Sequence, residues 1–235
     1  GCCRRPLWIV HSPNDAAILF GCPMTPSFSF LSLSAIVAAY FLGSLSFAVI
    51  ISRLMGLHDP RSYGSGNPGA TNVLRSGSKK AAALTLLLDA VKGRLPVFLL
   101  MQFGSGWQLG PDAAALAGLA AFIGHLYPVF FRFKGGKGVA TAAGVLFGFS
   151  PWLGVLVVLV WILMAAALRY SSLAALSATA VAAPLYWVGA SQDWWTRSLS
   201  ILAVCTVMAI MLTWRHRPNI QRLLAGQESR IGKKR

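Results

Sequence analysis

Apolar stretches of about 20 residues recur along this chain, and no other feature of the sequence restricts its fold as strongly. A helix of that length crosses the hydrocarbon core of a membrane. We expect seven spans, over residues 30–52, 81–102, 112–131, 138–150, 152–168, 172–190 and 197–214. The fourth is short, and Ser150-Pro151 breaks the chain before the fifth, so short or broken helices or a re-entrant pair are expected there. The predicted fold is an all-α membrane protein with about seven transmembrane helices.

The charge balance agrees with a membrane location. Only 11% of the residues are charged, whereas a soluble domain carries about a quarter. The net charge of +15 raises the question of nucleic-acid binding. However, the basic residues lie between apolar spans, as the positive-inside rule expects, and not on a compact soluble surface. We therefore expect contact with membrane lipid and no nucleic-acid partner.

Lysine and arginine also predict the orientation. The loops at 103–111 and 191–196 contain neither residue type. The basic residues gather instead in segments 53–80 and 132–137, at Arg169 and from Arg215 onward. Seven spans bring these basic segments to one face, which the positive-inside rule places in the cytoplasm, with Arg197 as an exception. The expected arrangement has the N-terminus outside, and the C-terminus and the glycine-rich loops in the cytoplasm.

Residues 1–23 differ from the rest of the chain. They mix charge, proline and polar residues, and they lack the continuous apolar region of a signal peptide. Met24 is followed by a more ordinary membrane-protein start. We expect residues 1–23 to be an upstream or non-native extension, and residues 24–235 to form a single integral membrane domain.

Segment 61–75 has a composition suited to binding an oxyanion. Glycines permit backbone conformations that expose N–H groups, small polar side chains add donors, and arginine matches the geometry of phosphate. The residues concerned are Arg61, Gly64, Ser65, Gly66, Asn67, Gly69, Thr71, Asn72 and Arg75. A flexible loop is the alternative, but two asparagines, a threonine and two arginines in one short segment favour binding.

Two further segments carry related chemistry. In residues 133–141 a glycine turn opens a predicted helix, which is a typical phosphate site, although the spacing is not that of a Walker A loop. Lys134 and Lys137 alone would suit a membrane anchor, which leaves Gly135, Gly136 and Gly138 unexplained. In the third segment, from Arg215 to Glu228, a lipid headgroup anchor is the alternative to a site containing His216 and Asn219.

Placing charged residues inside membrane spans costs free energy, so such residues usually face each other or a cavity. Asp89 and Lys92 are i, i+3 neighbours, for which we expect an ion pair first, with Lys92 also able to reach an anionic ligand. His125 is expected to be a packed, hydrogen-bonded histidine. The few acidic residues form no acid–base or metal constellation, and no nucleophile elbow is present. This inventory suits two anionic ligands held by backbone amides and cations, with no metal or other cofactor.

These segments resemble a known family. The sequence Gly64-Ser-Gly-Asn-Pro-Gly-Ala-Thr-Asn72 with Arg75, the sequence Lys134-Gly-Gly-Lys-Gly-Val-Ala-Thr141, and His216 with Asn219 and Glu228 closely resemble three signatures of the bacterial acyl-phosphate-dependent glycerol-3-phosphate acyltransferases. Asp89 with Lys92-Gly93, and Arg169 with Ser171-Ser172-Leu173, also match in order. The resemblance covers roughly residues 30–230. Ser46 departs from the pattern, which has proline there, and this predicts an altered helix bend.

The resemblance implies a multi-pass enzyme of the bacterial inner membrane. Such an enzyme transfers a fatty acyl group from acyl phosphate to the 1-hydroxyl of glycerol 3-phosphate, which yields lysophosphatidate and phosphate. Its expected partners are acyl phosphate, glycerol 3-phosphate and membrane lipid, with the soluble enzyme that makes acyl phosphate as a further candidate. No cofactor is expected.

The resemblance and the residue chemistry together suggest roles. Catalytic roles are expected of Ser65, Asn67, Thr71, Asn72, Arg75 and His216. Substrate binding is expected of Arg61, Lys92, His125, Lys134, Gly135, Gly136, Lys137, Gly138 and Asn219. Asp89 and Glu228 are expected to be structural, and no residue is expected to bind a metal. Because no protein carboxylate is well placed as a base, a phosphate oxygen of the substrate is expected to take the hydroxyl proton.

Two other classes of membrane protein compete with this interpretation. A small transporter or channel for an anionic solute would also have a basic cavity and broken helices. Against it, the charged set lies at one edge of the spans, and no internal repeat is visible. Another lipid-headgroup enzyme is the second alternative, but the metal-binding aspartates of a CDP-alcohol transferase are absent.

Overall fold

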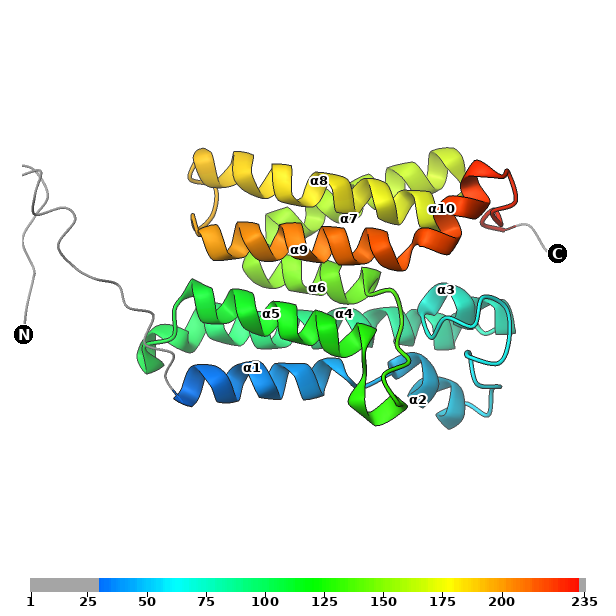
Figure 1. Ribbon diagram of the computed structural model, residues 1–235, viewed down its shortest axis with the longest axis horizontal. Coiled ribbons are helices and arrows are strands. Elements are labelled where there is room, and N and C mark those ends of the chain that lie inside the picture. The colour runs from blue at the N-terminus through cyan, green and yellow to red at the C-terminus, as the bar shows by residue number, and fades with distance from the viewer. Residues whose placement is uncertain (1–29, 233–235) are drawn as a thin grey trace, which may run out of the picture.

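The structure is a computed structural model that describes residues 30–232, so the predictions for residues 1–23 and Met24 lie outside the described residues. Every regular element in that part of the chain is a helix. The longer helices pack side by side into a bundle, and α2, α3 and α10 gather at one end of it (Figure 1). The elements are α1 (Phe30–Gly43), α2 (Phe47–Leu54), α3 (Ala70–Val73), η2 (Leu74–Ser76), α4 (Lys79–Phe103), η3 (Gly104–Trp107), α5 (Pro111–Leu126), η4 (Val129–Phe131), α6 (Val139–Phe149), α7 (Pro151–Leu168), α8 (Ser171–Ser191), α9 (Leu199–Arg215) and α10 (Arg217–Leu224).

The all-α prediction is confirmed, whereas the count of seven spans stays a prediction. Within residues 30–232, three segments are long and apolar enough to cross a membrane, namely Pro111–Phe131, Pro151–Leu168 and Ser171–Ser191. The bent pairs α1–α2 and α9–α10 raise this number to five if each pair forms one span. Helix α4 has 25 residues but carries several charges, and α6 has only 11 residues.

The expected continuous span over residues 30–52 is broken. Helix α1 ends at Gly43, and α2 starts at Phe47 with a bend of 44° between the two axes. The break leaves the carbonyl of Leu45 without a helical partner, and the Lys92 ammonium on α4 donates to it at 2.6 Å. The apolar run on both sides of the break hides it from a hydropathy pattern. Ser46, the departure from the family pattern, lies within this break.

The short fourth helix and the break after it are confirmed. Helix α6 ends at Phe149, and α7 begins at Pro151, a residue that suits the first turn of a helix because its missing N–H would have no partner there. The Ser150 hydroxyl accepts a hydrogen bond from the Leu153 N–H and so caps α7.

Glycine allows α4 and α6 to approach each other closely. A Cβ atom on Gly93 of α4 would collide with the backbone carbonyl of Thr141. One on Gly144 of α6 would collide with the carbonyl of Ala90. Small residues at such crossings are typical of helix pairs in membranes, where van der Waals contact replaces the hydrophobic effect as the source of association. This crossing fixes the start of α6, and hence the segment Lys134–Gly138 before it.

Large apolar side chains cover the outside of the bundle. Leu163 on α7, Trp187 on α8 and Ile210 on α9 are 66%, 55% and 65% exposed. An exposed surface of this kind would be costly in water and suits the hydrocarbon of a membrane.

Candidate active site

Four basic segments meet at the end of the bundle where α2, α3 and α10 lie (Figure 1). The Arg75 guanidinium donates to the Ser229 hydroxyl at 3.0 Å, and Arg169 donates to the carbonyl of Ile231 at 3.0 Å. Arg215 donates to the carbonyls of Gly135 and Gly136 at 2.9 and 3.0 Å. Segments that are far apart in the sequence are therefore tied together by arginine side chains.

A chain of hydrogen bonds joins the second segment to the third. The Lys137 ammonium donates to Asn219 Oδ1 at 2.6 Å, and Asn219 Nδ2 donates to Glu228 Oε1 at 2.7 Å. Glu228 also accepts from the Ser172 hydroxyl at 2.8 Å and from Arg222 at 2.7 Å. Lys137 and Asn219 therefore lie in one network, which we call the Lys137 network, and Glu228 anchors it.

Burial changes the acid–base behaviour of this network. Desolvation lowers the pKa of Lys137 to about 8, although the nearby Glu228 carboxylate opposes the shift. Burial also acts to raise the pKa of Glu228, but the hydrogen bonds from Asn219, Ser172 and Arg222 outweigh it and hold that pKa below its ordinary value. At neutral pH Lys137 is a cation and Glu228 an anion, so the network can present positive charge to a ligand.

The Asn72 side chain holds the first glycine segment in shape. Its Oδ1 accepts from the Ser65 N–H at 3.0 Å, and its Nδ2 donates to the carbonyls of Pro60 and Tyr63 at 2.6 and 3.1 Å. Gly64 has a φ of +60°, and a Cβ atom there would collide with Asn72 Oδ1. Both amide hydrogens of Asn72 are used within the loop, so the residue positions its neighbours in this conformation.

The other polar residues of this segment lie around the Asn72 side chain, which acts as a clamp on the loop. Ser65 is exposed and Asn67 half-buried. The Thr71 hydroxyl lies 3.5 Å from the hydroxyl of Ser171, at the start of α8. Arg75 reaches Asn72 Oδ1 at 3.4 Å in addition to its bond to Ser229. The segment is thus fixed to the tail and to α8, with Ser65 facing solvent.

His216 lies at the junction of α9 and α10. It is 2% exposed, and its Nδ1 lies 2.8 Å from the carbonyl of Leu212. Because a carbonyl only accepts, Nδ1 carries a hydrogen, and the other ring nitrogen, Nε2, has no hydrogen-bond partner within residues 30–232. The charges of Lys137, Glu228 and Arg215 all act on the ring. Nε2 thus stays unpaired within residues 30–232, close to charged groups.

The charged residues inside the spans form a separate buried cluster. The predicted ion pair is present, with Lys92 Nζ 2.8 Å from Asp89 Oδ1, and Lys92 is only 1% exposed. His125 Nδ1 lies 3.6 Å from the same oxygen. The His125 carbonyl accepts from the Gly136 N–H at 3.2 Å, and a Cβ atom on Gly136 would collide with the histidine ring. The cluster lies beneath the second glycine segment and supports it.

Gly135 and Gly138 complete that segment. A Cβ atom on Gly135 would collide with the carbonyl of His125, and one on Gly138 would collide with the ring of Phe122. Gly138 also has a φ of +88°, which favours glycine, and no side chain caps the first turn of α6 that follows it. The N–H groups at this helix start are free to meet an anion.

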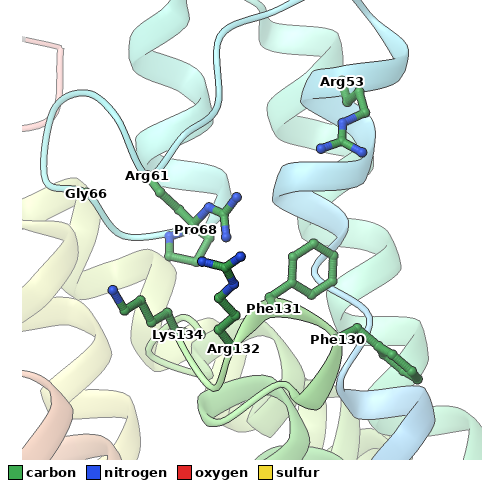
Figure 2. A pocket seen from close by; sticks show the side chains of 9 residues that line it. Arg53, Arg61, Gly66, Pro68, Phe130, Phe131, Arg132 and Lys134 are labelled. Atoms are coloured by element: carbon green, nitrogen blue, oxygen red, sulfur yellow. The ribbon is translucent and has the colours of Figure 1, made fainter.

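Arg61 and Lys134 lie apart from the Lys137 network. They line a cleft of ≈ 790 Å³ together with Arg53, Arg132, Phe130, Phe131, Gly66, Pro68 and Gly135 (Figure 2). Arg61 is also bound to Asp59, with Nη2 and Oδ2 2.6 Å apart. The structure therefore places the predicted site residues in several groups. These are the first glycine segment around Asn72, the Lys137 network with His216 nearby, the buried cluster of Asp89, Lys92 and His125, and this cleft.

The sequence prediction missed Arg215 and the cleft residues Arg53 and Arg132. The proximity of Arg215 to His216 was the available signal for the first. For Arg53 and Arg132, the positive-inside rule already explained why basic residues lie in these loops, so nothing in the sequence indicated that the two arginines line a cleft. Among residues 30–232, no group of three or more His, Cys, Asp or Glu side chains is placed to hold a metal ion.

Residues 33–226 match the family described as Glycerol-3-phosphate acyltransferase. A relative with that name from Albidiferax ferrireducens is 57% identical over 206 residues, which cover 88% of this chain and 92% of the relative. The relative of that name from Burkholderia pseudomallei strain K96243 is 59% identical over 203 residues, covering 86% and 97%.

Solved structures agree with these sequence matches. The crystal structure of PlsY, an integral membrane glycerol 3-phosphate acyltransferase, in its glycerol 3-phosphate form superposes with a TM-score of 0.77 at 41% identity. The match covers 86% of this chain and 96% of that one. The lysophosphatidic acid form gives a TM-score of 0.76 at 40% identity. The chain therefore belongs to the PlsY family of integral membrane glycerol-3-phosphate acyltransferases.

Proposed function

We propose that this protein transfers a fatty acyl group from acyl phosphate to the 1-hydroxyl of sn-glycerol 3-phosphate. The products are 1-acyl-glycerol 3-phosphate, which is lysophosphatidate, and inorganic phosphate. This is the first acylation step of bacterial phospholipid synthesis. The glycerol 3-phosphate and lysophosphatidic acid forms of the related PlsY structure are the acceptor and product that the proposal requires.

One observation carries the proposal. The three sequence segments with phosphate-binding chemistry come into direct contact, because Lys137 bonds to Asn219 and Arg215 bonds to the Gly135 carbonyl. Arg75 from the first segment bonds to the same C-terminal tail, at Ser229. These bonds therefore hold together the segments that carry Lys137, Arg75, Arg215, His216 and the N–H groups at the start of α6. Such a site suits two phosphorylated substrates that would otherwise repel each other.

The proposed reaction needs little activation by the protein. Acyl phosphate is a mixed anhydride, so the bond from its carbonyl carbon to the phosphate oxygen breaks as the hydroxyl oxygen of glycerol 3-phosphate forms the ester. A phosphate oxygen takes the hydroxyl proton, and inorganic phosphate leaves. Holding the two substrates in line supplies several kcal/mol, and donors aimed at the developing oxyanion add about 3 kcal/mol. No metal or cofactor takes part.

We assign the residues as follows. Lys137, Arg75, His216 and Asn219 bind the phosphate and the hydroxyl groups of glycerol 3-phosphate. Ser65, Asn67 and Thr71 donate to the acyl phosphate and the oxyanion, while Asn72 positions their loop.

The remaining assignments concern support. Gly135, Gly136 and Gly138 let the backbone approach the substrates, and Asp89, Lys92 and His125 support that segment from below. Glu228 holds Asn219 in place. A direct contact of Lys92, His125, Arg61 or Lys134 with substrate stays a prediction.

The location follows from the same proposal. The enzyme is a multi-pass protein of the bacterial inner membrane, with the N-terminus outside and the active site and C-terminus in the cytoplasm. The acyl chain of acyl phosphate enters sideways from the cytoplasmic leaflet. The soluble enzyme that makes acyl phosphate is a candidate partner.

The test uses purified protein in lipid with palmitoyl phosphate and glycerol 3-phosphate, and follows phosphate and lysophosphatidate together. Parallel reactions contain palmitoyl-CoA in place of palmitoyl phosphate, or a metal chelator in addition. We expect one phosphate for each lysophosphatidate, no product from palmitoyl-CoA, and no effect of the chelator. Product from palmitoyl-CoA alone would contradict the assigned donor. No product from either donor, with folded protein, would favour an anion transporter instead.

A further inference from the structure

We propose that the cleft between α2, the first glycine segment and η4 binds the phosphate headgroup of an anionic membrane phospholipid. This site is separate from the Lys137 network, and it holds a resident lipid rather than a reactant. The proposal does not rest on the acyltransferase reaction, because it concerns binding without turnover.

The cleft contains more positive charge than its own residues balance. Four cations line it, namely Arg53, Arg61, Arg132 and Lys134. Of these four, Arg61 alone has an ion-pair partner in the described part of the chain, the carboxylate of Asp59. Within residues 30–232, no carboxylate lies within ion-pair distance of Arg53, Arg132 or Lys134. The side chains of these three residues also form no hydrogen bond there. Like charges gathered around a hollow repel one another, so the arrangement favours an anion between them.

Figure 2 shows how the cations are arranged, with the ends of Arg61 and Arg132 close together and Arg53 and Lys134 on either side of them. The Arg132 side chain extends toward Arg61 and Pro68, and Lys134 rises beside it from the same turn. Arg132 and Phe133 both have a positive φ, of 55° and 59°. Two successive non-glycine residues in this conformation cost free energy, and the Phe133 N–H holds the turn by donating to the carbonyl of Pro128 at 2.9 Å. This strained turn is what directs Arg132 into the cleft.

The cleft lies apart from the Lys137 network. Lys134 and Lys137 are three residues apart, yet Lys137 bonds to Asn219, whereas Lys134 lines the cleft. The two glycine segments are in close contact with each other, because a Cβ atom on Gly136 would lie 3.0 Å from the Pro68 carbonyl oxygen. A ligand in the cleft would therefore contact the outer side of these segments.

The rim of the cleft favours a lipid over a free anion. Phe130 lines the cleft and is 57% exposed, and its ring lies 5.9 Å from the ring of Phe41 on α1, which is 45% exposed. The cleft thus continues into an apolar surface that faces the membrane. A volume of ≈ 790 Å³ exceeds what a bare phosphate ion needs. Basic pockets between membrane helices are known to suit phospholipid headgroups.

The test measures lipid binding to the purified full-length protein by native mass spectrometry. The probes are phosphatidylglycerol and phosphatidylcholine with identical chains, titrated in detergent. The cleft variant is Arg53→Gln with Arg132→Gln, since neither residue has a proposed role in the reaction. The matched control is Lys79→Gln with Lys80→Gln, which removes two exposed cations from the start of α4 outside the cleft.

We expect the wild-type protein to bind one phosphatidylglycerol about tenfold more tightly than phosphatidylcholine, as two or more interfacial cations would produce. The cleft variant should lose this preference, and the control variant should keep it. If both variants unfold at the same temperature as the wild-type protein, they are folded. If the double cleft variant does not fold, the single variant Arg53→Gln replaces it. Equal loss in both double variants would reveal diffuse attraction and overturn the proposal, as would retention in the cleft variant. Complete displacement of the lipid by excess inorganic phosphate would identify a site for the free ion and also overturn it.

Discussion

Replacing Glu228 with alanine should destabilise the protein more than it impairs the chemical step. The carboxylate side chain is 7% exposed and ties the C-terminal tail to two helices, because it accepts from Ser172 on α8, and from Asn219 and Arg222 on α10. Alanine removes every acceptor at once. The donors of Ser172 and Asn219, both of which are buried, would then have no partner.

The size of the effect follows from these contacts. A hydrogen bond to a charged group contributes about 1.5–3 kcal/mol, and leaving a buried donor without a partner loses that amount. Two buried donors therefore cost about 3 kcal/mol or more. The bond from Arg222 adds less than about 1 kcal/mol, since that arginine is 40% exposed. Glu228→Gln keeps one oxygen acceptor for the two buried donors, so it should cost only about 1 kcal/mol.

Unfolding in mixed micelles by SDS titration would measure these free energies, and single-turnover acyl transfer would measure the chemical step. Asp193→Asn is the control, because that carboxylate is 89% exposed and its only ion pair within residues 30–232 is a 3.5 Å contact with Arg197. Asparagine tolerates the positive φ of 57° at this position. A normally folded and fully stable Glu228→Ala protein that has lost acyl transfer would refute the structural assignment. Acidification should act in the same direction. Because the pKa of Glu228 is held below its ordinary value of 4.5, its stabilising effect is complete above that pH and is lost as the pH falls through the lowered pKa.

Three other perturbations probe other parts of the molecule. Deprotonation of Lys137 above its pKa of about 8 should raise the KM for glycerol 3-phosphate about tenfold per pH unit. The variant Lys137→Arg should not show this rise below pH ~10. A KM that does not change with pH in the wild-type protein would contradict the role of the Lys137 charge. Gly144→Ala should destabilise the protein by at least about 2 kcal/mol, because the new Cβ meets the rigid backbone of Ala90. Gly106→Ala, which has open space around it, is the control in unfolding measurements. Asn72→Ala should lower kcat/KM by about tenfold or more, since two loop carbonyls lose their donor; wild-type kinetics in this variant would show that the loop keeps its shape without the clamp.

Much of the architecture was predictable because it depends on local patterns. The apolar runs predict helices in a membrane, and Ser150-Pro151 marks the end of α6 and the start of α7 through capping chemistry that neighbouring residues determine. The Asp89–Lys92 pair was also predictable, since i, i+3 residues share a helix face. For the break between α1 and α2, the resemblance predicted only an altered bend at Ser46. The interruption Ser44-Leu45-Ser46 is short within a long apolar run, and the Lys92 contact at Leu45 comes from another helix.

The candidate site shows the same division. Glycine content, small polar residues and cations predicted three functional segments without any knowledge of their contacts. Those properties did not predict that Asn72 would use its amide within its own loop, or that Arg215 would hold the Gly135 and Gly136 carbonyls. Both contacts are made to backbone carbonyls in loops. Loops have no repeating sequence pattern, unlike helices and strands, so the direction of these carbonyls cannot be predicted from the sequence.

The sequence by itself determined the class of the protein, the chemistry of its segments and, through resemblance, the family to which it belongs. Only the tertiary structure decided which charges act together. Lys134 and Lys137 occupy one short segment and are chemically alike, yet they serve the cleft and the Lys137 network respectively. The physical reason is that side-chain direction in a glycine-rich turn depends on what the backbone packs against. Here that packing comes from other parts of the chain, since the His125 ring and the Pro68 carbonyl both lie against Gly136.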